Sequence, residues 1–222
     1  MRLFQGLPED TLHSIASRCA WRRCPAGELI VSRETREHEV YLLVSGTARV
    51  TAFSASGRQV TYRDLSAGDW FGDLAAVDHR PRSADVVAQT EALVACMRGG
   101  DFIDLVLQSP QVARALLEHL VQRVRELTDR VFELSTLGVQ NRIDAEVLRL
   151  AKSAGVTRNA ARIDPAPLHA DVASQVSTNR EQVTREISQL VKLGIVSRDG
   201  KALVVPDVAR LERLVAEVRR TA

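Results

Sequence analysis

A heptad pattern in residues 109–138 constrains this chain more than any other feature of its sequence. Six apolar residues recur there at alternating spacings of three and four: Leu117, Leu120, Val124, Leu127, Val131 and Leu134. This spacing is typical of the seam along which one long helix packs against another. Pro110 suits the first turn, where no amide donor is needed, and Gly138 suits a left-handed residue that closes the last turn.

Charged residues flank this seam and predict solvated, partly paired outer faces. They are Glu118, Arg123, Arg125, Glu126, Asp129, Arg130 and Glu133. A helix buried within its own domain would carry a similar stripe. We favour a connecting helix that pairs with a second copy of itself, because strand-like segments precede it and helical segments follow it.

The length of 222 residues allows two domains, each with its own core. We expect a β-rich domain at 1–107, a connecting helix at 108–137 and a helical domain at 138–222. No signal peptide is recognisable and the apolar runs are too short to span a bilayer, so we expect a cytoplasmic protein with no membrane partner. The chain has three cysteines, and an odd number in a reducing compartment argues against a disulfide framework.

Short β-prone runs dominate the first domain after a short helix at 6–18. The runs are 28–32, 39–46, 47–53, 58–65 and 85–97, and the turn glycines between them are Gly27, Gly46, Gly57 and Gly68. Many short strands with regularly placed glycine turns indicate a sandwich, jelly roll or small barrel. With the helices that follow, the fold class is α+β.

Residues 70–84 interrupt this pattern with the composition of an anion site. Gly72 allows close approach to backbone amides, and a helix beginning near 73–75 points its positive end at the same place. Arg82 can hold a phosphate with two hydrogen bonds, and Ser83 adds a hydroxyl donor. Asp73 would repel a phosphate but can accept a hydrogen bond from a sugar hydroxyl. Together they predict a pocket for a phosphate and a ribose.

The last part of the chain is helical and basic. Residues 138–222 carry a net charge of +4, against −2 for residues 1–137. After a helix that Gly155 ends and a loop at 155–167, we predict helices at 169–176 and 180–193 joined by the turn 177–179. A hairpin follows, with Asp199 and Gly200 as its two-residue turn. This order predicts a winged helix–turn–helix.

The exposed face of the second helix carries side chains that read base edges. Arg180 and Arg185 can each bind guanine O6 and N7, while Glu181 can accept from cytosine N4. Further polar residues are placed to contact phosphates and so position the protein without reading sequence: Asn179, Thr184, Ser188 and Lys201. These residues predict a double-stranded DNA partner.

The segment FGDLAAVDHRPRSADVVA resembles the phosphate-binding cassette of cyclic nucleotide-binding domains in the CRP/FNR family of bacterial transcription regulators. The resemblance implies that backbone groups of Gly72, Leu74 and Ala75 line the phosphate, with Arg82 and Ser83 bound to it. Asp73, where the family's nucleotide-responsive members usually have glutamate, would take the ribose 2′-OH. Two positions midway along the long helix would meet the purine base, and here they are Leu127 and Thr128.

The same resemblance covers nearly the whole chain. It implies an N-terminal β-roll (a double-stranded jelly roll) that binds a cyclic nucleotide, a long dimerisation helix and a C-terminal winged helix–turn–helix. REQVTR resembles the recognition helix of the catabolite-activator branch, which implies a homodimer on an inverted repeat similar to TGTGA. We expect cAMP as the effector, with cGMP open because only Thr128 offers the base a hydrogen bond. Residues 135–138 would act as a hinge, and the loop 155–167 is a candidate contact for RNA polymerase.

An enzyme would need a catalytic constellation, and neither that nor a metal-ligand spacing is recognisable among the five scattered histidines. Two other interpretations remain. A haem or redox sensor of the same fold could use Cys24 or His79 as a ligand, whereas the single C-x₄-C pair argues against an iron–sulfur cluster. The second interpretation is a family member with a vestigial cassette that binds DNA constitutively.

Overall fold

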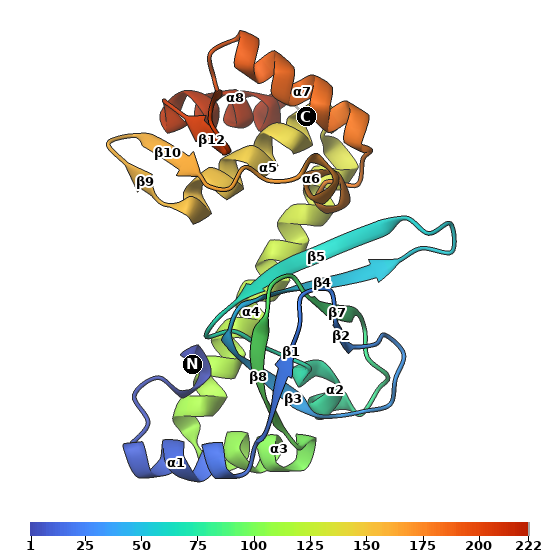
Figure 1. The fold of residues 1–222 in the computed structure, drawn as a ribbon, viewed down its shortest axis with the longest axis vertical. Coiled ribbons are helices and arrows are strands. Elements are labelled where there is room, and N and C mark those ends of the chain that lie inside the picture. Colours follow the sequence, from blue (N-terminus) through green and yellow to red (C-terminus); the bar gives the residue numbers. More distant parts are fainter. Residues whose placement is uncertain (222) are drawn as a thin grey trace. The chain divides into compact units, whose positions relative to one another are not determined.

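The computed structural model describes residues 1–221, with side chains described as far as residue 217. The chain forms two compact units, Met1–Arg125 and Glu126–Ala222 (Figure 1). The boundary falls inside the long helix α4 (Pro110–Thr136), so each half of this helix belongs to a different unit. Within residues 1–221, no helix combines the length and the apolar character needed to cross a bilayer.

Two four-stranded antiparallel sheets form the centre of the first unit. One has the strand order β1-β8-β3-β6, from Ala20–Cys24, Ala92–Met97, Val40–Ser45 and Trp70–Phe71. The other has the order β2-β7-β4-β5, from Leu29–Val31, Asp85–Ala88, Thr47–Phe53 and Gln59–Ser66. Most neighbours within the sheets come from distant parts of the sequence, as in the predicted jelly roll, whereas β4 and β5 form a hairpin.

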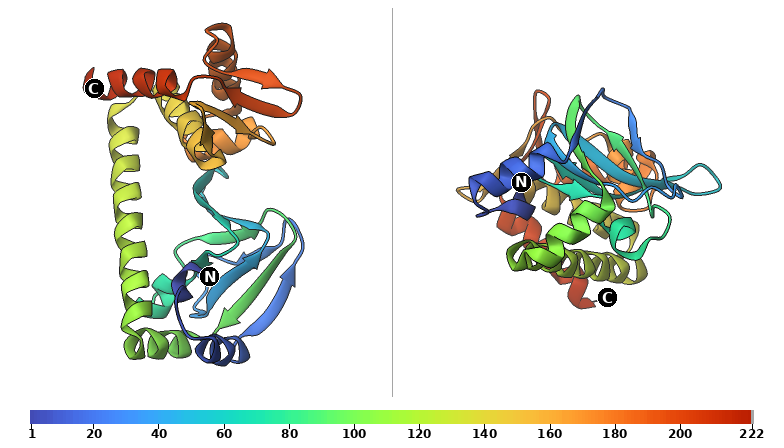
Figure 2. Two further views of the ribbon diagram at one scale, coloured as in Figure 1. Left: turned by 90° about the vertical axis from the view of Figure 1, so that its left-hand side faces the viewer. Right: turned by 90° about the horizontal axis from the view of Figure 1, so that it is seen from below.

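The first four residues of β3 are buried on both faces of the sheet, which explains why β3 reads as an unbroken apolar run. Tyr41 and Leu43 point into a core shared with the second sheet, while Val40 and Leu42 point to the opposite face. Helices cover that opposite face (Figure 2): η1 (Arg2–Phe4), α1 (Glu9–Ser17), α2 (Asp73–Asp78), α3 (Gly99–Gln108) and the start of α4. The phosphate cassette lies between β6 and β7 and includes α2.

Three segments of this unit differ from what the sequence predicted. Residues 85–97 are not one strand but two, β7 and β8, separated by a turn at 89–91. The β1 strand escaped prediction because its first four residues, AWRR, are all exposed and show no alternation. The helix α3 escaped it because two glycines begin it.

The second unit contains the end of α4 and the C-terminal helical domain. Its helices are α5 (Val139–Ala154), α6 (His169–Gln175), α7 (Arg180–Lys192) and α8 (Val208–Thr221). Its sheet has the order β11-β12-β10-β9, from Ser197–Asp199, Ala202–Val205, Ala160–Ile163 and Val156–Thr157. The apolar faces of α5, α6, α7 and α8 meet strands β10 and β12 in one core. This is the predicted winged helix–turn–helix, confirmed in its two central helices.

Three local predictions in this unit were wrong. The supposed loop 155–167 contains the hairpin β9–β10, whose turn residues Arg158 and Asn159 are both left-handed without being glycine. In the wing, Asp199 pairs with Ala202, so the turn is Gly200-Lys201 and not Asp199-Gly200. Gly138 has φ −61° and caps the start of α5, because α4 already ends at Thr136.

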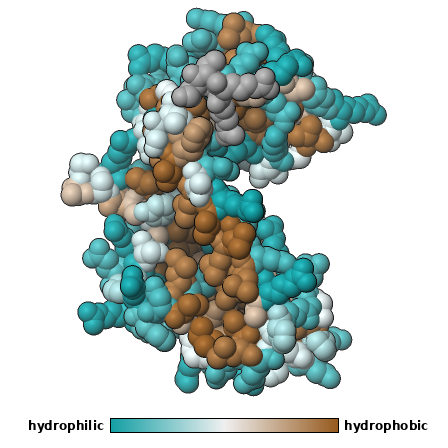
Figure 3. All heavy atoms as spheres, turned by 180° about the vertical axis from the view of Figure 1, so that it is seen from behind, coloured by the Kyte–Doolittle hydropathy of each residue, from teal (hydrophilic) through white to brown (hydrophobic). Residues whose placement is uncertain are grey.

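The heptad residues of α4 are largely exposed. Large apolar side chains open to solvent on this helix are Leu117, Val121, Val124, Leu127, Val131, Phe132 and Leu134. Leu120 is the exception, because it packs against the core of the first unit, and Val121 takes its place in the exposed row. The space-filling view from behind shows a broad apolar area on the first unit (Figure 3).

Candidate nucleotide and DNA sites

The cassette begins at Gly72, which has φ +91° and caps the N-terminus of α2. This conformation is open to glycine and strained for other residues. A Cβ atom at Gly72 would lie 2.6 Å from both the Glu39 carbonyl oxygen and the Arg82 Nη1 atom. The backbone therefore approaches the Arg82 guanidinium as closely as contact allows.

Arg82 is 3% exposed, and its guanidinium binds the protein's own backbone. Nη1 donates to the Gly72 carbonyl at 2.9 Å and Nη2 donates to the Glu39 carbonyl at 2.6 Å. The Glu39 carboxylate lies 3.7 Å from Nη2, and the Tyr41 ring lies under the guanidinium at 5.8 Å. Burial raises the pKa of Tyr41 to about 12, so this ring stays neutral. In the described part of the chain, Arg82 Nε is buried without a hydrogen-bond partner, so the two backbone carbonyl groups do not use every donor of the guanidinium.

Asp73 lies beside Gly72 with its carboxyl group buried. Burial raises its pKa, while Arg63, the amides of Asp73 and Leu74, and Arg123 act in the opposite direction. The Asp73 carboxyl group thus lies buried at the start of α2 and is not an exposed helix cap. The sequence could not foresee this, because an acidic residue at a helix N-terminus also suits an exposed cap.

The other cassette residues divide by exposure. Ser83 and Leu74 are exposed, whereas Ala75 is buried. Gly72, Asp73, Arg82 and Ser83 thus come from one segment that β6, α2 and β7 hold in place. Leu127 and Thr128, expected to meet a base, are exposed on the part of α4 that belongs to the second unit.

The recognition helix α7 presents the predicted base-reading face. Arg180, Glu181 and Arg185 are exposed, while Val183, Ile187 and Leu190 fix the opposite face in the core. Asn179 caps the helix, and its side-chain oxygen accepts from the Gln182 amide at 2.9 Å. Ser177, in the turn before α7, has φ +56° and occupies a left-handed position that glycine would fill with less strain.

The predicted phosphate contacts are also exposed, but two hydroxyls are already engaged. Thr184 donates to the Arg180 carbonyl at 2.9 Å, and Ser188 donates to the Thr184 carbonyl at 2.8 Å. Lys201 is exposed in the wing turn. Two residues that the sequence did not single out accompany them. His169, on α6, contacts Thr184, and Arg198, on β11, lies close enough to His169 to affect its pKa.

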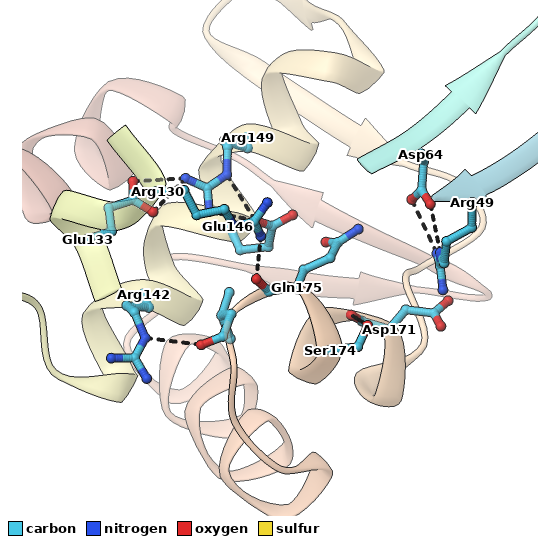
Figure 4. Close-up of polar contacts among 11 residues, drawn as sticks. Arg49, Asp64, Arg130, Glu133, Arg142, Glu146, Arg149, Asp171, Ser174 and Gln175 are labelled. Carbon is cyan, nitrogen blue, oxygen red and sulfur yellow. Dashed lines mark hydrogen bonds and ion pairs between the residues drawn. The ribbon is translucent and has the colours of Figure 1, made fainter. Parts of the chain in front are cut away.

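A cluster of ion pairs with buried carboxylates and a partly exposed arginine joins α4 to α5 within the second unit (Figure 4). Arg149 holds both oxygens of the Glu133 carboxylate, at 2.9 and 3.0 Å, and contacts Glu146 at 2.6 Å. Arg130 lies 3.8 Å from Glu146 and donates to the Gln175 carbonyl. Glu133 is 3% exposed, so its predicted place on a solvated flank was wrong. It is buried because α5 packs against this side of α4.

The candidate haem or redox ligands are not gathered into a centre. Cys24 is fully buried in the sheet core, and His79 is exposed with its ring 5.3 Å from that of His38. Among the described residues, no group of three or more His, Cys, Asp or Glu side chains could hold a metal ion. Cys19, Cys24 and Cys96 all have free thiols.

Comparison with known proteins matches both parts of the chain to established families. Residues 21–109 match the cyclic nucleotide-binding domain, and residues 111–214 match the Crp-like helix-turn-helix domain. A CRP-like cAMP-activated global transcriptional regulator from Mycobacterium tuberculosis is 22% identical over 212 residues, covering 95% of each chain. The cyclic AMP receptor protein of Thermus thermophilus is 27% identical over 212 residues, covering 96% of this chain and 95% of the relative.

Solved structures show the same fold. A c-di-GMP responsive global regulator from Xanthomonas campestris superposes with a TM-score of 0.76 at 19% identity, covering 90% of this chain and 99% of the other. The two matched domains are those of a ligand-binding, DNA-binding transcription regulator and not of an enzyme. The chain belongs to the CRP/FNR family.

Proposed function

We propose that this chain is a homodimeric regulator whose affinity for an inverted repeat of TGTGA-like half-sites is set by a cyclic nucleotide bound at Arg82 and Ser83. One observation carries the proposal: the same chain holds a phosphate-type cassette and an exposed Arg180-Glu181-Arg185 face on a rigid recognition helix. Neither feature alone would connect a small signal to a DNA sequence.

The DNA half of the proposal follows from the chemistry of α7. Two exposed arginines and one glutamate in the first half of the helix match the hydrogen-bonding pattern of G·C pairs in the major groove. Exposed Ser188 and Lys201, with Asn179 and Thr184, supply contacts to the flanking phosphates. The core behind α7 holds this set at fixed spacing.

The ligand half rests on the cassette. Arg82 Nε is a buried donor without a partner, and the exposed Ser83 hydroxyl lies next to it in sequence. A bound cyclic phosphate would satisfy both. We favour cAMP because the relatives from Mycobacterium tuberculosis and Thermus thermophilus are named for cAMP, and keep cGMP as the alternative because Leu127 offers the base no hydrogen bond.

Dimerisation, which both of these halves require, is inferred from the exposed apolar row of α4. Seven large apolar side chains open to water along one helix are stable when a second helix covers them. Residues 135–138 would then transmit a change in the paired helices to the DNA-binding unit. Residues 155–167, with the exposed strand β9 and the exposed turn residues 158–159, remain our candidate contact for RNA polymerase.

Fluorescence anisotropy with a labelled TGTGA palindrome tests the proposal directly. The titration is run at fixed salt without ligand, with cAMP and with cGMP, since salt alone changes such affinities strongly. We expect one nucleotide to tighten binding. Equal affinity in all three conditions would remove nucleotide control, and absence of binding would remove the DNA site.

Arg180→Ala tests base reading. We expect a loss of about 1–3 kcal/mol on the cognate site and relaxed preference at one base pair. Arg162→Ala, an exposed arginine of β10 paired with Asp164 and Asp199, is the control. Equal weakening on every sequence would make Arg180 a phosphate contact.

Val124→Glu tests the dimer. A charge placed in the apolar row should convert the dimer to monomer in sedimentation experiments at micromolar protein. Val156→Glu, which changes another exposed valine outside α4, is the control. An unchanged dimer in the Val124 variant would place the interface elsewhere.

The constitutive alternative also has an observation in its favour. Arg82 already donates hydrogen bonds to the Gly72 and Glu39 carbonyl groups, and the Asp73 carboxyl group is already buried at the start of α2. A cassette held together in this way is stable without ligand. The three-condition titration separates this alternative from nucleotide control.

A further inference from the structure

His169 lies on α6 and connects this helix to the recognition helix α7 through its contact with Thr184. Its Nδ1 atom lies 2.7 Å from the Thr184 hydroxyl oxygen. Thr184 donates its only hydroxyl proton to the Arg180 carbonyl at 2.9 Å, so its oxygen accepts from His169. On this basis we assign the ring proton to Nδ1, so that Nε2 is the nitrogen that gains or loses a proton.

The surroundings of the imidazole are positive. The ring is partly buried, and burial, then Arg198, then Arg180 lower its pKa below the usual value. Arg180 comes from α7 and Arg198 from β11, while Asp171 is the carboxylate of the ring's own helix. His169 thus lies among the residues proposed to meet DNA, next to one base-reading arginine and close to a wing arginine.

We propose that His169 belongs to the DNA interface and takes up a proton when DNA binds, so that affinity for DNA rises as the pH falls. This inference rests on the proposed DNA-binding function. The proton comes from solvent and converts the neutral imidazole to imidazolium at Nε2; no covalent bond between protein and DNA forms or breaks.

The sign follows from the charges. In the free protein burial, then Arg198 and then Arg180 oppose protonation and lower the pKa of His169. DNA phosphates placed beside the same arginines neutralise them and favour the imidazolium, so the pKa rises in the complex. Proton uptake therefore accompanies binding between the lower and the higher of these two pKa values. A difference of one pKa unit corresponds to about a tenfold gain in affinity across that range.

The experiment measures DNA affinity from pH 8 to 5.5 at fixed salt, on the palindrome and on a scrambled duplex, with the full chain. His169→Asn keeps a donor near the Nδ1 position but does not titrate. His13→Asn, an exposed histidine on α1, is the control. We expect the wild type and the His13 variant to tighten by several-fold as pH falls, on both duplexes. The His169 variant should lose most of this slope.

Histidine NMR gives a second readout that does not depend on affinity. The pKa of His169, measured in the free chain and in the DNA complex, should be higher in the complex. An equal or lower pKa in the complex overturns the inference. So does a pH slope that survives in the His169 variant while Arg180→Ala still weakens binding, and in that case the proposed function stands. Failure of the wild type to bind either duplex overturns both.

Discussion

Arg149 grips the Glu133 carboxylate with one nitrogen placed 2.9 and 3.0 Å from its two oxygens, and so ties the end of α4 to α5. Arg142 adds two hydrogen bonds next to this contact, to the Leu137 carbonyl at 2.9 Å and to the Val176 carbonyl at 3.0 Å. Side-chain hydrogen bonds and an ion pair therefore hold the segment proposed as the hinge, 135–138, against α5. A movement there would have to rearrange specific hydrogen bonds, as expected for a two-state switch.

Arg149→Ala should destabilise the second unit strongly. The substitution leaves Glu133 and Glu146 buried with their main partner gone, and removing one side of such a pair costs about 2–4 kcal/mol. Urea unfolding measures the loss. Arg114→Ala removes an ion pair with Glu118 that is exposed on both sides, and should change little. Equal effects of the two variants would show that burial of the cluster contributes nothing.

Gly72→Ala should destabilise the first unit more than Gly57→Ala. Both glycines have positive φ, +91° and +78°, so both variants carry a backbone penalty of about 1 kcal/mol. Only at Gly72 does the new methyl group meet backbone, 2.6 Å from the Glu39 carbonyl oxygen; at Gly57 nothing lies within 4 Å. We expect a further loss of about 1–3 kcal/mol at Gly72, measured by urea unfolding. Matching losses would mean that the loop containing Glu39 moves aside without penalty.

Asp144→Asn should stabilise the protein at alkaline pH and have little effect near pH 4. Burial, with a contribution from Glu186, raises the pKa of Asp144 from 3.8 to about 7. Its folded-state pKa therefore exceeds its unfolded value. The wild type loses stability as pH rises from about 4 to 7, because over this range the Asp144 carboxyl group is ionised in the unfolded chain and protonated in the folded one.

The expected gain at pH 8 is about 2–4 kcal/mol, measured by urea unfolding at several pH values. Asp129→Asn, an exposed carboxylate on α4, is the control and should show no such trend. A constant difference between the wild type and the Asp144 variant across this pH range would contradict the prediction.

Ser83→Ala should weaken nucleotide binding without disturbing the fold. The hydroxyl is exposed, and one lost hydrogen bond to a charged phosphate corresponds to about 1.5–3 kcal/mol, or roughly tenfold or more in affinity. Calorimetry with cAMP and cGMP measures it, and unfolding in urea should be unchanged. Ser56→Ala, in the β4–β5 turn, is the control. Wild-type nucleotide affinity in the Ser83 variant would remove this residue from the site.

Periodic features of the chain were predictable from sequence. The long helix, the glycine turns of the first unit and the two central helices of the second all repeat at the spacing of their secondary structure. The order of those elements was enough for the fold class. The hairpin β9–β10 was not predictable, because Arg158 and Asn159 adopt left-handed conformations that only the surrounding sheet explains.

The candidate sites were predictable in residue type but not in orientation. Sequence placed Arg82 and Asp73 in the cassette, yet which way a side chain turns depends on partners distant in sequence, such as Glu39 for Arg82. Glu133 illustrates the same limit. A charge beside a heptad seam looks solvated until the helix packed on it is known. His169 carried no signal at all, because its partner Thr184 lies on another helix.

The hydrogen bonds from Arg82 to the carbonyl groups of Gly72 and Glu39 also affect which residues of such a cassette can change during evolution. A lineage that stopped sensing nucleotides would still need this arginine and this glycine to hold the segment in shape, so selection would keep both. Ser83, exposed and without that duty, would be free to drift. In descendants of this chain, retention of the serine, and not of the arginine, would therefore indicate that the cassette still binds a nucleotide.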